Sequence, residues 1–382
     1  MENEFIYIDH AATTPVHPDV LQAMQPYFIE MYGNPSSIHR FGQKARQAID
    51  ASRTRIAGLL SCTVDELVFT SGGTESNNLA IRGTVTDSLG KHVITSTVEH
   101  HAVLHVCREL ERLGCEVTYL PVNEQGMVKP EDVRAAIREQ TALISIMYGN
   151  NEVGTLQPIE EIGTLAREHG ILFHVDAVQA PGNAELLLSR LPVDLMSLSA
   201  HKIRGPKGIG ALYVRRGTQL QSQLFGGSQE RKRRAGTENV ASIVGFATAM
   251  ELACEQTTRK HTWLASLRKL LIDRLIESMG SDSFVVNGHP QHHLPHIVNI
   301  SFPGIRAETM LMNLDLEGIA ASSGSACSAG SLEPSHVLRA MSLPESVQAS
   351  AVRFSMAYDT TEKEILKIVK KIETIYHRLR IK

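Results

Sequence analysis

The segment DLMSLSAHKIRGPKGIG, residues 194–210, is the most informative stretch of this chain. An apolar strand pattern runs to Ser199, Lys202 follows it, and a glycine-rich turn comes next. A lysine enclosed at a strand end loses part of its hydration and of its preference for the charged form, which frees its amine to form a Schiff base. Most lysines are solvated loop residues, and Lys207 is the competing candidate here. We favour Lys202 because it lies nearer the strand end.

A second strand end lies just upstream, in ILFHVDAVQ, residues 171–179. This apolar strand pattern ends in Asp176, and Gln179 follows three residues later. A carboxylate at a strand end either caps a helix or, in a pyridoxal enzyme, pairs with the protonated ring nitrogen of the cofactor. Gln179 would then reach the phenolic oxygen of the same ring.

A third strand end opens the segment LVFTSGGTESNNLA, residues 67–80. The pattern is a strand, a glycine turn and a helix start, where Gly73, Thr74 and the free helix amides can hold a phosphate. A turn that only caps the helix is an equal alternative. The segment matches neither the G-x-x-x-x-G-K-[ST] phosphate loop nor the G-x-G-x-x-G dinucleotide pattern.

Short apolar runs alternate with helical patterns through most of the first 250 residues or so. The runs are LVFT, KHVITS, EVTYL, ALISIM, ILFHV and DLMSLS. This alternation predicts an α/β fold with a mostly parallel sheet and helices on both faces. Ligands bind such sheets in the crevice beyond the carboxyl ends of the strands, where the three polar segments lie.

The pattern changes near residue 255. Leucines from Leu264 to Leu275 repeat at helical spacing, a strand pattern IVNISF follows, and Thr361 with Glu364 forms a capping box for a closing amphipathic helix. We therefore expect a large domain of residues 15–255. A smaller α+β domain is expected from residues 1–14 and 256–382.

Composition excludes several classes of protein. The chain has 382 residues, 42% hydrophobic and 21% charged, with a net charge of −3, which gives no basic field for nucleic acid. No apolar run reaches the roughly 20 residues of a membrane helix. The first ten residues, MENEFIYIDH, are acidic where a signal peptide is basic, so we expect a cytoplasmic protein without direct nucleic-acid or membrane contact.

The five cysteines are scattered and never form a C-x-x-C pair, so neither a disulfide framework nor a zinc ribbon is indicated. Four lie in apolar or helical patterns typical of buried thiols. Cys327 differs because it lies in SSGSACSAGS, a run of small residues. Alternatively, this segment is a connector and its cysteine takes no part in the chemistry.

A phosphate turn, an aspartate and a lysine in this chain order are typical of a pyridoxal-phosphate fold. Ten segments in sequence order, spanning nearly the whole chain, resemble the cysteine desulfurases of the NifS/IscS type in the class V aminotransferase group. They are YIDHAATTP, GNPSSIH, FTSGGTESNNLA, VEHHAVL, NNEVGTLQPI, HVDAVQ, SAHKIRGPKGIGALYVR, RAGTENV, SSGSACSAGSLEPSHVLRA and VRFSM. The segment around Cys327 resembles the S-S-G-S-A-C group rather than the R-x-G-H-x-C group.

The resemblance implies the pyridoxal-phosphate-dependent transferase fold, similar to aspartate aminotransferase, with a seven-stranded sheet in the large domain. It implies that L-cysteine becomes L-alanine and that its sulfur passes to Cys327 as a persulfide. The sulfur would serve iron–sulfur cluster assembly or tRNA thiolation through an acceptor protein. No resident metal is implied, apart from a transient iron–sulfur contact through Cys327.

The resemblance also implies roles for individual residues. Lys202, Cys327 and His100 would be catalytic. His100 is preferred to His101 because the histidine of the family pattern directly follows glutamate. Asn151 and Arg353 would bind the substrate, the guanidinium taking its carboxylate. Residues expected at the pyridoxal 5'-phosphate are Gly73, Thr74, His100, Asn151, Asp176, Gln179, Ser199, His201, Lys202 and, from the second subunit of a homodimer, Thr237.

Alternatives stay open. An aminotransferase or a selenocysteine lyase can use the same fold, and a non-catalytic sulfur-relay module can retain it. The segment HPQHHLPH, residues 289–296, is expected to be a solvated turn rather than a metal site. RKRR, residues 231–234, is either a tRNA-docking patch or part of the cofactor surroundings. The chain ends at Lys382, without the tail that docks an iron–sulfur scaffold in some relatives, which favours a tRNA-thiolation acceptor.

Overall fold

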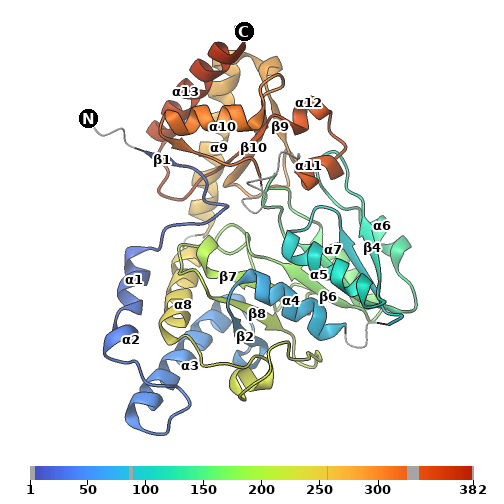
Figure 1. The fold of residues 1–382 in the computed structure, drawn as a ribbon, viewed down its shortest axis with the longest axis vertical. Coiled ribbons are helices and arrows are strands. Elements are labelled where there is room, and N and C mark those ends of the chain that lie inside the picture. Colours follow the sequence, from blue (N-terminus) through green and yellow to red (C-terminus); the bar gives the residue numbers. More distant parts are fainter. Residues whose placement is uncertain (1–4, 86–88, 256, 325–334, 381–382) are drawn as a thin grey trace.

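The structure is a computed structural model that describes residues 5–85, 89–255, 257–324 and 335–380 (Figure 1). Cys327 lies outside the described residues. The described chain is built around a seven-stranded sheet with strand order β2-β8-β7-β6-β5-β3-β4. Its strands are β2 (Leu67–Thr70), β3 (His92–Ser96), β4 (Glu116–Leu120), β5 (Thr141–Met147), β6 (Leu172–Asp176), β7 (Leu195–Ser199) and β8 (Gly210–Val214).

The sheet is mostly parallel, as predicted. Only the two pairs made by β8, with β2 and with β7, are antiparallel. All six apolar runs of the sequence form strands, whereas β8 was not identified from its sequence. Strands β2, β3, β7 and β8 are buried at every residue, because helices cover both faces of the sheet.

Helices pack on both faces of this sheet and create two separate cores. Adjacent strand residues point to opposite faces, so Val68 joins one core and Phe69 the other. The helices of this part are α1 (Pro18–Met24), α2 (Pro26–Ile29), α3 (Arg40–Leu60), α4 (Gly73–Thr84), α5 (His101–Arg112), α6 (Pro130–Ala136), α7 (Ile159–Glu168) and α8 (Val240–Cys254). Short 3-10 turns are η1 (Val64–Glu66), η2 (Ala200–Lys202) and η3 (Gln229–Lys232).

The rest of the chain forms a smaller α+β unit. It has an antiparallel sheet of β12 (Ala351–Ser355), β10 (Ile297–Ser301) and β9 (Val285–Asn287), and β1 (Ile6–Tyr7) pairs in parallel with β11 (Ile319–Ala320). Its helices are α9 (Thr257–Met279), η4 (Ser281–Ser283), α10 (Ala307–Leu316), α11 (His336–Ala340), α12 (Glu345–Gln348) and α13 (Glu362–Arg380).

A third core lies in this smaller unit. The leucines of α9, from Leu264 to Leu275, pack with Ile6, Ile8 and the apolar face of α13. The predicted capping box is present, since Thr361 N donates to Glu364 Oε2 at 2.7 Å and Glu364 N donates to Thr361 Oγ1 at 3.2 Å. The division of the chain at residues 15–255 and 256–382 stays a prediction. No helix within the described ranges has both the length and the apolar character needed to cross a lipid bilayer.

Candidate active site

The carboxyl ends of β2, β6 and β7 border a cavity of about 220 Å³. The sequence-predicted site residues that line it are Gly73, Thr74, His100, Asn151, Asp176, Gln179, Ser199, His201, Lys202 and Arg353. Parallel strands place their carboxyl ends at one edge of the sheet, which brings these distant residues together. Thr237 is exposed and is absent from this lining, and Cys327 lies outside the described residues.

One end of the cavity is the glycine turn before α4. Gly72 has a φ of +148°, which side-chain-bearing residues rarely adopt, and a Cβ on Gly73 would lie 2.7 Å from Val178 Cγ2. No side chain of the described chain caps this helix. The amides of its first turn are therefore available to an anion, next to the hydroxyl of Thr74.

Asp176 is the last residue of β6 and is buried. Its two oxygens accept separate hydrogen bonds, Oδ2 from Asn77 Nδ2 at 2.7 Å and Oδ1 from the Val178 amide at 3.1 Å. These contacts fix the carboxylate in the cavity wall. Asn77 was not predicted to take part, although the quoted segment contains it, because the pattern does not show which helix face meets β6.

Lys202 follows β7 directly, in the turn η2. Its Nζ donates to the backbone carbonyls of Ala11 at 2.7 Å and Ala12 at 2.8 Å, and both alanines line the same cavity. Gln179 Nε2 also donates to the carbonyl of Ala11, at 2.9 Å. Lys207, the competing candidate, is exposed and does not line the cavity.

His100 is the N-cap of α5, and its Nδ1 accepts a hydrogen bond from the Ala102 amide at 3.1 Å. Burial lowers the pKa of His100, which favours the neutral imidazole with its proton on Nε2. Glu99 before it is fully buried and accepts from Ser96 Oγ at 2.7 Å and from the Met147 amide at 3.0 Å. Burial raises the pKa of Glu99 to about 8. The cavity lining includes His100 and not His101.

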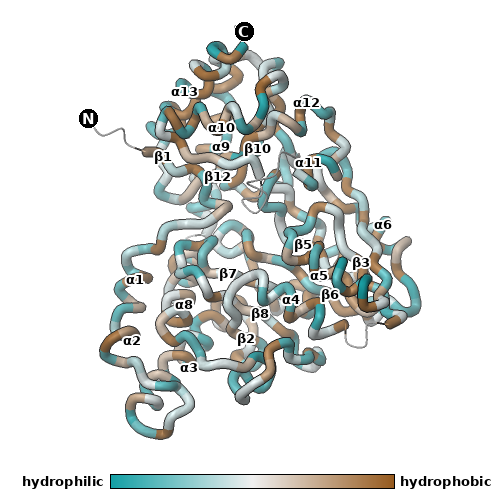
Figure 2. The backbone as a smooth tube through the Cα atoms, in the orientation of Figure 1, coloured by the Kyte–Doolittle hydropathy of each residue, from teal (hydrophilic) through white to brown (hydrophobic). Residues whose placement is uncertain are grey.

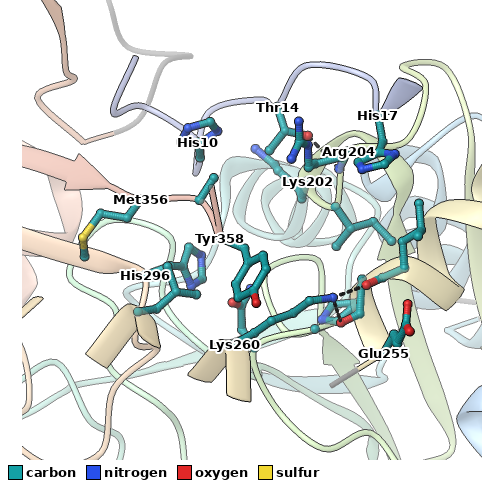
Figure 3. Close-up of a pocket in the computed structure, with 18 residues that line it drawn as sticks. His10, Thr14, His17, Lys202, Arg204, Glu255, Lys260, His296, Met356 and Tyr358 are labelled. Atoms are coloured by element: carbon teal, nitrogen blue, oxygen red, sulfur yellow. Dashed lines mark hydrogen bonds between the residues drawn. The ribbon is translucent and has the colours of Figure 1, made fainter. Parts of the chain in front are cut away.

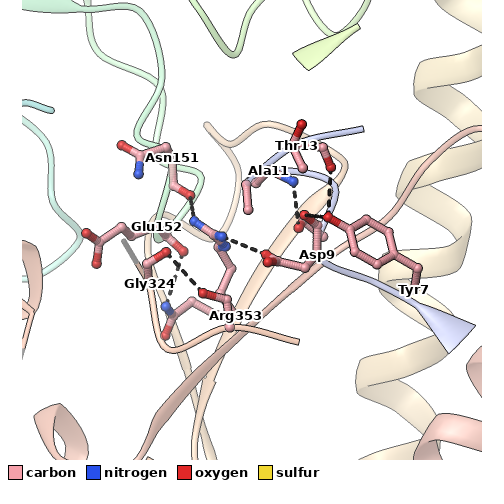
Figure 4. A network of polar contacts seen from close by, with 12 residues as sticks. Tyr7, Asp9, Ala11, Thr13, Asn151, Glu152, Gly324 and Arg353 are labelled. Carbon is pink, nitrogen blue, oxygen red and sulfur yellow. Dashed lines mark hydrogen bonds and ion pairs between the residues drawn. The ribbon is translucent and has the colours of Figure 1, made fainter. Parts of the chain in front are cut away.

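Arg353 in β12 is fully buried and already paired (Figure 4). Its Nη1 donates to the carbonyl of Asn151 at 2.8 Å, and its Nη2 donates to Asp9 Oδ1 at 2.7 Å. Its Nε is buried and has no hydrogen-bond partner among the described residues. A carboxylate that enters the cavity would therefore meet a guanidinium that Asp9 and Asn151 hold in place.

A second cavity of about 290 Å³ also has Lys202 in its lining (Figure 3). Its lining includes Lys260, whose Nζ lies 5.6 Å from the centroid of the Tyr358 ring. His296 belongs to this wall and is buried, with Nε2 3.5 Å from Gln179 Oε1. The prediction of a solvated turn for residues 289–296 is therefore wrong at His296, because β10 begins at the next residue and draws it inward.

The basic segment 231–234 is partly engaged in ion pairs. Arg234 Nε lies 2.9 Å from Glu75 Oε1 in the first turn of α4, and Arg231 Nη2 lies 2.7 Å from Asp65 Oδ1. These contacts place the segment beside the glycine turn. Its role in tRNA docking stays a prediction. Within the described ranges, no group of three or more histidine, cysteine or acidic residues is arranged to hold a metal ion.

The first cavity has the chemical features that pyridoxal phosphate requires. Lys202 provides an amine, Asp176 provides an anchored carboxylate for the ring nitrogen, and the uncapped start of α4 provides amides for the phosphate. Val178 leaves no room for a Cβ at residue 73. Because Gly73 has none, the backbone there can approach a bound phosphate closely. The residues therefore fit the cofactor.

Comparison with known proteins agrees with this chemistry. The family described as aminotransferase class-V matches residues 6–368. Cysteine desulfurase IscS of Dictyoglomus turgidum is 48% identical over 377 residues, covering 98% of this chain and 95% of the relative. The enzyme of the same name from Methanosarcina thermophila is 48% identical over 381 residues, covering 99% of this chain and 94% of the relative.

Solved structures agree as well. A NifS-like protein is 36% identical with a TM-score of 0.92, covering 98% of this chain and 100% of that one. A structure titled SspA in complex with cysteine is 38% identical with a TM-score of 0.82, covering 92% of this chain and 98% of that one. The chain therefore belongs to the aminotransferase class-V family and, within it, to the pyridoxal-phosphate-dependent cysteine desulfurases of the NifS/IscS type.

Proposed function

We propose that this cysteine desulfurase transfers the sulfur of L-cysteine to Cys327 as a persulfide and releases L-alanine. The C–S bond of the substrate breaks and an S–S bond forms at Cys327. The electron pair of the C–S bond stays with the substrate carbon, which takes up the proton that the Cys327 thiol releases. The reduction of the substrate carbon balances the oxidation of the two sulfur atoms, so no external oxidant or reductant is needed.

The assignment of residues to the cofactor rests on the shared cavity. Bound pyridoxal phosphate supplies an electron sink that stabilises negative charge on the substrate carbons. Asp176 would face the ring nitrogen, and Gln179 the ring's phenolic oxygen. The phosphate would be held by Gly73, Thr74, Ser199 and His201, with Thr237 of a second subunit.

The proton movements rest on Lys202 and His100. Lys202 Nζ would remove the Cα proton of the substrate, since its amine lies in the same cavity and can act as a base when it is neutral. His100 would donate a proton from Nε2, because its Nδ1 is engaged by the Ala102 amide. Asn151 and Arg353 would orient the substrate, with its carboxylate on the guanidinium.

The single observation that supports this function best is the amine of Lys202 in one cavity with Asp176, His100 and Arg353. A single turnover with L-cysteine tests the sulfur step. Mass spectrometry should find one added sulfur atom on the peptide that contains Cys327. Cys327→Ala should form neither the persulfide nor alanine at an appreciable rate, and undiminished turnover in this variant would overturn the proposal.

Cys62→Ala is the matched control for that experiment. Burial raises the pKa of the Cys62 thiol to about 12, which leaves almost no thiolate at neutral pH. The control should therefore form the persulfide at the wild-type rate. Lys202→Ala should lose the visible absorbance of the lysine-bound cofactor and at least about 100-fold in turnover.

We propose that the enzyme is a homodimer. Large apolar side chains are exposed around α2 and the start of α3, and α2 is visibly hydrophobic in Figure 2. Ile29 is 79% exposed and Ile38 92%. Such a surface is typical of one that a second copy covers. Thr237 is exposed in the single chain, which suits a contact made across the dimer.

Subunit complementation tests this dimer and the role of Thr237 together. Lys202→Ala and Thr237→Ala subunits should each be impaired alone. A mixed dimer contains one site with both native residues if Thr237 serves the neighbouring cofactor, so mixing should restore activity. Mixtures no more active than the sum of the separate variants would contradict a shared site.

The sulfur acceptor is proposed to be a protein of iron–sulfur cluster assembly or tRNA thiolation, in the cytoplasm. The relatives named IscS support the first destination. Enzyme loaded with radioactive sulfur should pass its label to one class of purified acceptor faster than to free thiols. Equal transfer to acceptors and to free thiols would contradict a dedicated protein partner.

A further inference from the structure

The carboxyl group of Glu152 meets two residues that border the segment 325–334. Ser335 Oγ donates a hydrogen bond to Glu152 Oε2 at 2.5 Å. A Cβ built on Gly324 would lie 2.5 Å from the same oxygen, so Gly324 packs directly against it. Gly324 and Ser335, the described residues on either side of the segment that contains Cys327, therefore both lie beside one side-chain atom. Figure 4 shows Glu152 and Gly324 near Arg353.

Glu152 is itself held firmly. It is fully buried, its amide donates to Asn150 Oδ1 at 2.8 Å, and its carbonyl accepts from Asn299 Nδ2 at 3.1 Å. Asn151, its neighbour in the chain, lines the cofactor cavity and accepts from Arg353. Glu152 thus directly follows a residue of the cavity lining, although Glu152 itself does not line the cavity.

Both borders of the segment are also connected to the site by further contacts. Upstream, Arg353 N donates to the Ser322 carbonyl at 2.6 Å, and Ser322 N donates to the Arg353 carbonyl at 3.2 Å. Downstream, His336 Nε2 lies 2.9 Å from the Glu99 carbonyl and must donate to it, because a carbonyl only accepts. One border is thereby joined to the proposed substrate arginine, and the other to the residue before His100.

Core packing does not account for a glutamate at this position. Burial raises the pKa of Glu152, and the nearby Ser335, His336 and Arg353 only partly oppose this. A buried carboxyl group costs stability that an apolar side chain of similar size would not. The carboxyl group is explained instead by its contacts with Gly324 and Ser335.

We propose that Glu152 is a positioning residue for sulfur transfer: its Oε2 accepts a hydrogen bond from Ser335 and packs against Gly324, and so fixes the two described residues that flank the segment containing Cys327. The inference rests on the proposed persulfide role of Cys327. A reacting group is delivered faster when the residues that flank it are held in a fixed place relative to the substrate site.

Four variants of the holoenzyme test the inference. Glu152→Ala and Ser335→Ala should each slow single-turnover persulfide formation on Cys327 by about 10- to 100-fold, the usual effect of misplacing a reacting group. KM for cysteine and the visible spectrum of the bound cofactor should stay unchanged, because neither residue contacts substrate or cofactor. Glu152→Gln should recover most of the rate, since its amide oxygen can still accept from Ser335. The double variant should be no slower than Glu152→Ala.

Ser350→Ala is the matched control. Ser350 is a buried serine of the same unit that donates to the Ser346 carbonyl at 2.7 Å, and no hydrogen bond joins it to Glu152. It should transfer sulfur at the wild-type rate. A general loss of packing would instead slow Ser350→Ala as much as Ser335→Ala and would overturn the positioning role.

Failure of the inference and failure of the proposed function give different results. Full desulfuration by Cys327→Ala would refute the persulfide role itself. An inactive Cys327→Ala together with wild-type persulfide rates in Glu152→Ala would refute only the positioning role. A Glu152→Gln variant as slow as Glu152→Ala, with an intact cofactor spectrum, would also refute positioning through the Ser335 hydrogen bond.

Discussion

Arg353 Nη2 donates to Asp9 Oδ1 at 2.7 Å, although 344 positions of the chain separate the two residues. Asp9 lies just before Ala11 and Ala12, whose carbonyls accept from Lys202. The short N-terminal segment thus contacts both the proposed substrate-binding cation and the proposed catalytic amine. It aligns the smaller unit, which contains β12, with the carboxyl edge of the main sheet.

Arg353→Lys should raise KM for cysteine by about 10- to 100-fold, because lysine cannot make the two-pronged contact of a guanidinium with a carboxylate. The kcat should change by less than about threefold, since the contact is expected in both ground and transition states. Steady-state kinetics give both values. Arg306→Lys, at an exposed site, is the control. A normal KM in Arg353→Lys would refute its role in binding the carboxylate.

Asp9→Asn should lower the free energy of unfolding by about 1–3 kcal/mol, because it removes a charge-assisted hydrogen bond from a buried guanidinium. Urea unfolding of the holoenzyme measures this. Asp359→Asn breaks the more exposed pair with Arg204 and should cost less than about 1 kcal/mol. Equal effects of the two variants would contradict a special contribution from the buried pair.

Asn77→Ala should weaken cofactor binding by about tenfold or more, because Asp176 loses the donor that fixes one of its oxygens. The readout is the visible absorbance of the bound cofactor during titration of the apoenzyme. Asn78→Ala is the matched control, since Asn78 is half-buried and donates to the Thr74 carbonyl at 2.9 Å within its own helix. If both variants bound the cofactor normally, Asn77 would have no part in holding Asp176.

Glu99 should make the stability of the protein depend on pH. Its pKa rises from the ordinary 4.5 to about 8 in the folded state, so the folded protein retains a proton that the unfolded chain releases. The associated stability is fully present below about pH 4.5 and is lost as pH rises toward about 8, by about 1.4 kcal/mol per pH unit.

Glu99→Gln removes this titration, and its stability should fall less steeply over the same range. Urea midpoints at several pH values compare the two slopes. Glu131→Gln is the control, because Glu131 lies in the exposed first turn of α6. Parallel curves for the wild type and Glu99→Gln would show that Glu99 titrates normally.

Much of the fold was readable from local patterns. The six apolar runs predicted six strands of the main sheet, and the structure confirms each of them. β8 was missed because it directly continues a glycine-rich turn, where turn signals obscure a strand of only five residues. The family assignment was also correct, since the motifs around Lys202, Asp176 and His100 are specific and occur in sequence order.

The candidate site was predictable only in part. Gly73, Asp176 and Lys202 were found because each follows a strand, and parallel strands bring their carboxyl ends to one edge. Asn77, Ala11 and Asp9 were not assigned roles, although their motifs were quoted. No local pattern shows that a helix side chain or a backbone carbonyl from another part of the chain will face the cavity.

Most of the strands, their order and the residue types available for chemistry follow from local patterns, because periodicity and turn formation depend on near neighbours. The partners of the buried polar groups follow from long-range packing: Asp9 for Arg353, Asn77 for Asp176, and Glu152 for Gly324 and Ser335. The physical reason is that a buried polar group needs a partner of matching geometry. That partner is supplied by whichever distant segment the fold brings against it.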